Sequence, residues 1–504
     1  MKLNCSLIIR KTKISVLFLL MLVASSCLEE AVIYNAEPSL DLQLPLILKF
    51  DQINCSYDAE TEMLRYYLPQ DSLSDFSPLI EFQKSSELFF NTNKLENNQL
   101  NNLGFVQINK PYQIEIRNGK TTKQLTLIFT NLPIIQIISD TKIYDEPKSI
   151  TRIQINSSEK NHHFTSFAGI ELRGRYSRDY EKKSMGFALW EGMDRSLEYS
   201  SELLGLKKNS DWILGAAFID PSRIRNLVSF EIWNGLNNLG NYHLGIQSRL
   251  VEVFLNNSFQ GIYVFSELLN EQLLGVDNNA VLYKGIEWAN GATKFESFNP
   301  EISINQFWNG WEQKIPDRKD RINWSPLNNL YELVVNGSDE DFASNIANHF
   351  NIENLIDYYL FLNLTLAIDN TGKNSFLFAE NDDTPLQYIP WDLDGSWGIL
   401  YDGTKIDYKA ILTNNLFDRL YEVDVENYRE KVKNRWLNLR EINFKKKNIA
   451  GVFDKYFKLM KASDIIQKEN LIWDINLNIE KEQMYINDWT ANRLEFLDNY
   501  FGEF

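Results

Sequence analysis

Short runs of apolar residues separated by polar turns dominate the chain from residue 41 to residue 133. Turn-prone pieces such as Asn118-Gly119-Lys120 lie between the runs, which is the pattern of strands joined by hairpins. The predicted strands span residues 44–50, 64–68, 79–82, 112–117 and 125–129. We therefore predict a small β-sandwich over residues 41–133, of the immunoglobulin-like kind, that acts as a spacer or docking module.

From residue 134 to residue 504 the pattern predicts strands first and helices later. One helix has clear signals, because Asp220 suits the N-cap, Pro221 suits the first helical position and Gly240 suits the end. The predicted strands span residues 150–155, 170–172, 187–190, 250–255 and 262–265, and helical periodicity dominates after about residue 405. The expected fold class is α+β.

The stretch from residue 351 to residue 398 is the most informative part of the chain. Asn351 is a candidate N-cap for a helix over residues 352–362, which is apolar on nearly every side and therefore expected to be buried. After this helix the sequence predicts a polar loop (369–374), a strand (375–379), a turn (381–384), a second strand (386–390) and a loop that begins Trp391-Asp392-Leu393-Asp394. These pieces predict one unit of helix, loop, hairpin and loop.

Four oxygen-bearing side chains lie in the two loops of this unit. A tight hairpin would place Asp369 and Asn374 at the same end as Asp392 and Asp394, and such oxygens suit Mg²⁺ or Mn²⁺. Protein kinases have a catalytic Asp, an Asn five residues later, a short hairpin and a metal-binding Asp, and the interval from Asp369 to Asn374 is also five. Each acidic pair alone is typical of a turn or a surface, so it is the joint spacing that favours a site.

The first residues have the features of an export signal. Basic residues precede an apolar core at 14–23 that is too short to span a bilayer as a mature helix. Ala24-Ser25-Ser26 leads directly to Cys27, as in the lipobox of bacterial lipoproteins. We predict a signal peptide over residues 1–26 and a lipid on Cys27, with cleavage without a lipid as the alternative.

A polar tether is predicted over residues 27–40. Its Leu28-Glu29-Glu30 resembles an acidic signal that some outer-membrane lipoproteins use to reach the cell surface. The expected location is therefore extracytoplasmic, on the outer membrane through the lipid anchor, with exposure at the cell surface.

Composition and charge narrow the function classes. Hydrophobic residues make up 44% and charged residues 24%, which is typical of a globular chain. The formal net charge of −17 argues against nucleic-acid partners, and an ATP site in this chain needs local Lys or Arg and a divalent metal. Cys5 is removed with the signal peptide and Cys27 carries the lipid, which leaves Cys55 without an intrachain disulfide partner.

Five segments, in order, resemble the CotH family, atypical kinases first associated with bacterial spore coats. They are residues 173–178 with 182–184, 211–214 with Asp220 and Arg225-Asn226, 253–257 with 261–267, 369–374, and 391–394. The resemblance covers about residues 135–500 and implies an atypical protein-kinase-like domain over residues 134–504 with a helical C-terminal part.

The resemblance also implies roles for the acidic loops. Asp369 would position or deprotonate the acceptor hydroxyl, and Asn374 and Asp392 would hold the metal with support from Asp394.

For the nucleotide, the resemblance implies that the turn from Arg173 to Arg178 covers the ATP phosphates in place of a Gly-rich loop. Lys182 would pair with the phosphates, although Lys183 could be the inward-facing residue, because alternate strand residues face opposite sides. The predicted nucleotide-binding residues are Arg173, Arg175, Ser177, Lys182, Lys183 and Glu267.

Three functions compete at this point. The first is ATP- and metal-dependent phosphoryl transfer to Ser or Thr of exported or cell-surface proteins. The second is a non-catalytic surface scaffold or adhesin built on the same fold. A metal-assisted hydrolase is the third, and it leaves Lys182 and the arginine turn without a purpose.

Overall fold

A computed structural model describes residues 47–502, apart from residues 73, 158–162, 175–176, 194–196, 240–242 and 300–302. The predicted signal peptide, the tether, Cys27 and Arg175 lie outside the described residues. Within the described part, no helix combines the length and apolar character that crossing a membrane requires.

Two β-sheets near the start of the described chain share one hydrophobic core. The first has the strand order β2-β1-β5-β8 and the second has the order β3-β4-β10-β9-β6-β7. The strands are β1 (Lys49–Phe50), β2 (Ile53–Asn54), β3 (Ser56–Asp58), β4 (Met63–Tyr67), β5 (Leu79–Glu81), β6 (Glu87–Phe90), β7 (Asn93–Leu95), β8 (Gln99–Leu100), β9 (Pro111–Asn118) and β10 (Thr121–Thr130). Phe50 and Ile80 of one sheet and Leu127 and Phe129 of the other are fully buried in the shared core.

Most of the strands expected in this region are confirmed. The predicted hairpin at Asn118-Gly119-Lys120 joins β9 to β10, with Asn118 paired to Thr121 and Gly119 in the left-handed conformation at φ +60°. β10 also pairs with β4, and this pairing is parallel. The immunoglobulin-like assignment stays a prediction.

Seven further strands close into a barrel in the order β11-β12-β13-β14-β15-β17-β16. They are β11 (Ile134–Ile138), β12 (Ser149–Asn156), β13 (His163–Arg173), β14 (Ser184–Trp190), β15 (Asp211–Gly215), β16 (Ser248–Leu255) and β17 (Ser258–Glu267). In β17, Tyr263 and Phe265 belong to the core of the barrel, while Ile262 and Val264 belong to the next core along the molecule. This alternation follows from the two-residue period of a strand, and it joins the barrel to the rest of the protein.

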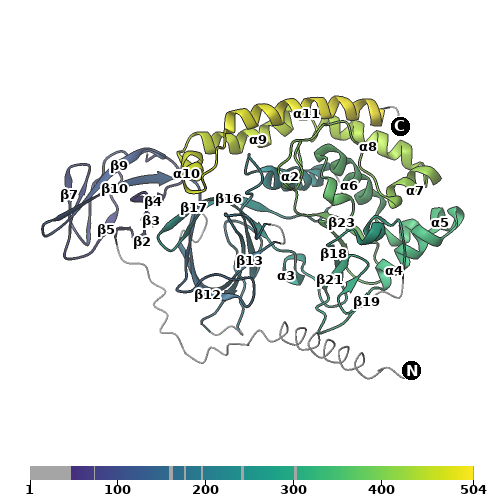
Figure 1. The fold of residues 1–504 in the computed structure, drawn as a ribbon, viewed down its shortest axis with the longest axis horizontal. Helices are drawn as coiled ribbons and strands as arrows, with labels where there is room; N and C mark the ends of the chain where they lie inside the picture. Colours follow the sequence, from purple (N-terminus) through teal and green to yellow (C-terminus); the bar gives the residue numbers. More distant parts are fainter. Residues whose placement is uncertain are drawn as a thin grey trace, which may run out of the picture. The chain divides into compact units, whose positions relative to one another are not determined.

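A third sheet and most of the helices surround the core to which Ile262 and Val264 belong. The sheet order is β19-β20-β21-β18-β22-β23. Its strands are β18 (Val281–Gly285), β19 (Ser303–Ile304), β20 (Phe307–Trp308), β21 (Trp311–Ile315), β22 (Ser375–Ala379) and β23 (Gln387–Pro390). The helices are α2 (Arg225–Gly235), α3 (Glu271–Leu274), α4 (Ser325–Tyr331), α5 (Asp339–His349), α6 (Ile352–Thr365), α7 (Asn415–Val423), α8 (Tyr428–Glu441), α9 (Lys446–Lys461), α10 (Ile465–Ile472) and α11 (Ile479–Gly502). The long helices α9 and α11 run side by side (Figure 1), and the α+β class is confirmed.

The start of α2 differs from the prediction. We expected Pro221 as the first helical residue, but the helix begins at Arg225 and continues past Gly235 only as a 3₁₀ turn over Leu236–Leu239. The Asp220 carboxylate accepts backbone hydrogen bonds from both Ser222 and Arg225, each at 2.8 Å. The Asp220 carboxylate therefore binds one amide in the turn that precedes α2, that of Ser222, and one amide at the start of α2, that of Arg225.

A buried charge cluster joins the first two sheets to the barrel. Arg65 of β4 is fully buried, with Nη2 2.5 Å from Oδ1 of Asp464 and Nε 3.2 Å from Oε2 of Glu252 on β16. The backbone amide of Ala59 also donates to the carbonyl of Asn257 at 2.9 Å. The two parts thus pack as one compact unit, and the domain limits stay a prediction.

Candidate active site

Helix α6 supports the first acidic loop. The side chain of Asn351 accepts a hydrogen bond from the amide of Asn354 at 3.0 Å, so the predicted N-cap is confirmed. Every residue of α6 from Asn354 to Thr365 is buried, as its apolar sequence predicts. Leu366 then adopts φ +51°, which ends the helix, and a 3₁₀ turn over Ile368–Thr371 carries Asp369.

The β22–β23 hairpin brings the two acidic loops to one end. Ser375 pairs with Pro390, and the amide of Trp391 donates to the carbonyl of Asn374 at 3.2 Å. The buried Asn370 strengthens this junction, because its side-chain amide donates to the carbonyls of Asn374 at 2.5 Å and Trp391 at 2.8 Å. One amide group therefore holds both loops at a fixed separation.

Two proposed metal ligands have unusual backbone conformations. Asn374 and Asp392 both have φ +55°, in the left-handed region that most residues avoid. Asn and Asp tolerate this region better than other non-glycine residues, and such strained positions cluster at functional sites.

The carboxylates of the two loops act on one another. Removal of water by the surrounding protein raises the pKa of Asp392, although part of the residue stays exposed to solvent. The charge of Lys284 opposes this rise, and the charge of Asp369 adds to it. Burial, together with Asp392 and Asp220, raises the pKa of Asp394 well above its usual range. Acids that repel one another in this way create a demand for cations.

Three basic residues face these acids. Nζ of Lys373 lies 2.9 Å from Oδ2 of Asp369. Burial lowers the pKa of Lys284 on β18 to about 8, against the attraction of Asp392. Burial likewise lowers the pKa of Arg173 at the end of β13, and Asp392 is among the carboxylates that oppose this shift.

The structure thus brings together five of the predicted site residues, although their roles remain predictions. They are Arg173, Asp369, Asn374, Asp392 and Asp394. Ser177 lies in the turn after β13, where its hydroxyl donates to the carbonyl of Arg173 at 3.2 Å.

The other predicted nucleotide-binding residues are held elsewhere. Lys182 is fully buried and forms an ion pair with Glu469 of α10, and its ammonium also donates to the carbonyl of Ile262 at 2.5 Å. Lys183 donates to the carbonyls of Arg178 and Tyr180 within its own turn. The described side chains of these two lysines therefore do not reach the acidic loops.

Glu267 is also occupied by its own surroundings. Its two carboxylate oxygens accept the backbone amides of Lys207 at 3.0 Å and Gln247 at 2.8 Å. Burial raises the pKa of Glu267 against these hydrogen bonds. This carboxylate joins the segments before β15 and β16, and its role at the nucleotide stays a prediction.

The donors present fit a magnesium or manganese ion that is only partly held by protein. Among the described residues, no group of three or more His, Cys, Asp or Glu side chains is placed to hold a metal by itself. Mg²⁺ at a nucleotide site usually takes one or two carboxylates and fills its other positions with water and phosphate oxygens. Asp392, with the amide of Asn374 and with Asp394 nearby, supplies that number of donors.

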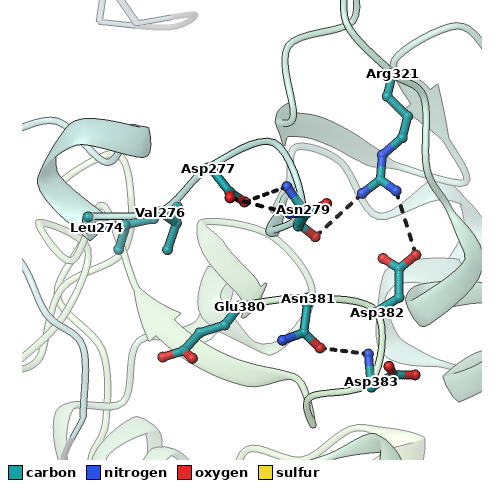
Figure 2. A pocket seen from close by; sticks show the side chains of 10 residues that line it. Leu274, Val276, Asp277, Asn279, Arg321, Glu380, Asn381, Asp382 and Asp383 are labelled. Atoms are coloured by element: carbon teal, nitrogen blue, oxygen red, sulfur yellow. Dashed lines mark hydrogen bonds and ion pairs between the residues drawn. The ribbon is translucent and has the colours of Figure 1, made fainter.

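A separate cavity lies at the opposite end of the same hairpin (Figure 2). It measures about 590 Å³, and the turn from Glu380 to Asp383 forms one wall. Arg321 crosses it, with Nη1 3.6 Å from Oδ2 of Asp382, and donates to the carbonyl of Asn279. Its lining contains none of the predicted site residues, so this cavity is not the junction of the acidic loops.

Sequence reasoning missed Lys284 and Lys373. Lys373 lies inside the interval from Asp369 to Asn374, so its position could have drawn attention to it. Lys284 is the one charged residue of β18, which reads Val-Leu-Tyr-Lys-Gly, and a lone charge in an apolar strand was a usable signal.

Two comparisons relate the chain to known proteins. The family model described as CotH kinase protein matches residues 170–497, more than half of the chain. The inner spore coat protein H of Bacillus subtilis (strain 168) is 21% identical over 391 residues, which are 74% of this chain and 98% of that protein. The matched region contains both acidic loops, the hairpin between them and Lys284. The chain therefore belongs to the CotH kinase protein family.

Proposed function

We propose that this chain transfers the γ-phosphoryl group of ATP to a Ser or Thr hydroxyl of an exported or cell-surface protein, with Mg²⁺ or Mn²⁺. The observation that carries the proposal is the meeting of Asp369 and Asp392 at one end of the β22–β23 hairpin. The cations around them, Lys373, Lys284 and Arg173, support it, because a phosphate group needs such neighbours in a chain of net charge −17.

In this proposal Asp392 and Asn374 hold the metal, and Asp394 assists. The bound ion would neutralise negative charge on the phosphates. Asp369 orients the acceptor hydroxyl and takes its proton while Lys373 holds the carboxylate in place. The hydroxyl oxygen forms a bond to the γ-phosphorus, the bond from that phosphorus to the bridging oxygen breaks, and ADP leaves with its electron pair.

The test is labelling of an acceptor protein with radiolabelled ATP and Mn²⁺. Asp392→Asn keeps the size of the side chain and removes its charge, so we expect labelling to fall about 100-fold or more. Asp383→Asn is the matched control, because Asp383 is exposed at the other end of the same hairpin. If Asp392→Asn labels as well as the wild type, the metal assignment is wrong.

The alternative is a surface scaffold or adhesin without turnover. The burial of Lys182 against Glu469 favours it, because the lysine that the family resemblance assigns to phosphate is held elsewhere. Thermal unfolding with and without ATP and Mn²⁺ separates the two functions. A ligand that binds only the folded chain raises the midpoint, and an unchanged midpoint would favour the scaffold.

We also propose that the protein is exported and anchored to the outer membrane through a lipid on Cys27, where its acceptor proteins lie. Cells that express the full chain should incorporate labelled fatty acid into the wild type and not into Cys27→Ser. Labelling of the Cys27→Ser chain would contradict this anchor.

A further inference from the structure

Lys284 lies beside the loop that carries the proposed metal ligand. It pairs with Phe376 across the β18–β22 ladder, and its Nζ lies 5.9 Å from the centre of the Phe376 ring. The same nitrogen lies 5.7 Å from the centre of the Trp391 ring, and Trp391 directly precedes Asp392. The ammonium group is therefore held over the start of the acidic loop.

Among the described residues, the ammonium group of Lys284 interacts with these two ring faces and, at longer range, with the carboxylate of Asp392. It forms no hydrogen bond and no ion pair there, although the residue is half-buried. Ring faces stabilise an ammonium only weakly compared with an anion at contact distance. A half-buried charge without a paired anion is costly, and a bound anion would remove this cost.

The backbone next to Lys284 touches the first acidic loop. The carbonyl of Gly285 accepts the amide of Asn374 at 3.0 Å. A Cβ atom at Gly285 would lie 3.2 Å from the carbonyl oxygen of Gly372, a tighter contact than most Cβ atoms make, so a glycine favours this close approach. β18 is thus fixed against both the loop of Asn374 and the loop of Asp392.

Arg173 reaches the same place from the barrel. Asp392 is one of the carboxylates that act on its charge, its Nη1 lies 3.9 Å from Oε1 of Glu171, and its side chain is 29% exposed. Gly186 on β14 leaves room for it, because a Cβ there would lie 2.4 Å from Cδ of Arg173. A guanidinium and an ammonium that both face one accessible carboxylate suit a ligand of mixed charge, such as a metal-bound polyphosphate.

Resting on the proposed function, we infer that Lys284, with Arg173, contacts the ATP phosphates, and that Lys182 and Lys183 do not. Lys182 is fully buried on Glu469, and Lys183 is bonded to carbonyls of its own turn. Lys284 keeps its donors free for an anion.

Calorimetric titration of the purified protein with MnATP and with adenosine tests this inference. Lys284→Met removes the charge and keeps most of the stem, so we expect the Kd for MnATP to rise by about tenfold or more. The Kd for adenosine should not change, because adenosine has no phosphate. Lys284→Arg keeps a positive charge and should retain most of the affinity, which provides a second variant if Lys284→Met folds poorly.

Two lysine variants serve as controls. Lys94→Met removes an exposed charge on β7, where Nζ lies 2.6 Å from Oε1 of Glu87, and it should bind MnATP like the wild type. Lys182→Met should lower stability and leave the affinity of the folded protein unchanged.

Two results would overturn the inference, and they can be told apart. Wild-type protein that binds MnATP and labels acceptor, together with Lys284→Met that binds equally well, would overturn only the role of Lys284. Wild-type protein that binds no MnATP and labels nothing would overturn the proposed function, and the role of Lys284 with it.

Discussion

Glu469 on α10 holds the ammonium group of Lys182 in an ion pair that solvent does not reach. The two residues are 287 positions apart, and the second oxygen of Glu469 lies 2.8 Å from Nε of Arg223. Burial raises the pKa of Glu469, but Lys182 and Arg223 lower it by more, so this pKa lies below its ordinary value. One anion thus serves two buried cations, and α10 is tied to the turns that precede β14 and α2.

The first prediction is that Glu469 matters more for stability than Lys182. Glu469→Gln leaves two buried cations without an anion, so we expect a loss of about 3–5 kcal/mol in the free energy of unfolding. Lys182→Met leaves Glu469 paired with Arg223 and should cost less. Urea unfolding of the three proteins checks this order, and equal losses would contradict it.

The second prediction concerns pH. Burial lowers the pKa of Lys182 from 10.5 to about 8, and Arg223 adds to this effect. Between those pH values the unfolded chain keeps the proton that the folded chain has lost, so the free energy of unfolding rises with pH. One titrating group can change the free energy of unfolding by at most about 1.4 kcal/mol per pH unit.

Lys182→Met has no titrating group at position 182. The difference in stability between the wild type and this variant therefore reports the titration of Lys182. The stability of the wild type relative to Lys182→Met should increase when urea unfolding is repeated at pH 9.5 instead of pH 7. A constant difference, or one that falls as pH rises, would show that Lys182 keeps its proton throughout this range.

The third prediction tests the junction between the first two sheets and the barrel. Arg65→Met leaves Glu252 buried without its cation, and we expect a loss of about 3–5 kcal/mol in the free energy of unfolding. Arg117→Met is the control on the same sheet, because Arg117 and Glu115 form a pair at the surface, where solvent screens the charges and the pair should contribute little to stability. Equal effects of the two variants would mean that the Arg65 cluster does not stabilise the junction.

The local parts of this fold could be predicted from sequence, and the reason is physical. The cap at Asn351, the buried helix after it and the hairpin are set by residues a few positions apart, and the structure has each of them. The proximity of Asp369 to Asp392 followed from the hairpin, because a hairpin determines which residues share an end.

The partners of the lysines could not be predicted in this way. Lys182 meets Glu469 and Lys284 lies beside Phe376 only because distant elements pack together. The position of each lysine in the sequence could not show that Lys182 forms an ion pair with a carboxylate and that, within the described part of the chain, Lys284 does not. The closure of the barrel was likewise missed, because the parallel pairing of β11 with β16 joins strands more than 100 residues apart.

The last prediction concerns Asn370, whose side-chain amide joins the two acidic loops. Asn370→Ala removes both hydrogen bonds and leaves two partly buried carbonyls with fewer donors, which should cost about 1–3 kcal/mol of stability. If the proposed function is correct, the larger effect is on metal binding, because Asn374 and Asp392 are no longer held at a fixed separation. Asn363→Ala is the matched control.

Asn363 is also a buried asparagine, and its side chain bonds to the carbonyl of Leu412 at 3.0 Å and to its amide at 2.8 Å, at the end of α6. Both variants should therefore lose stability. In titrations with Mn²⁺ and ATP at a temperature where both remain folded, only Asn370→Ala should lose affinity, by about tenfold. Equal affinities would mean that packing alone holds the two loops together, and that the amide of Asn370 serves the fold and not the site.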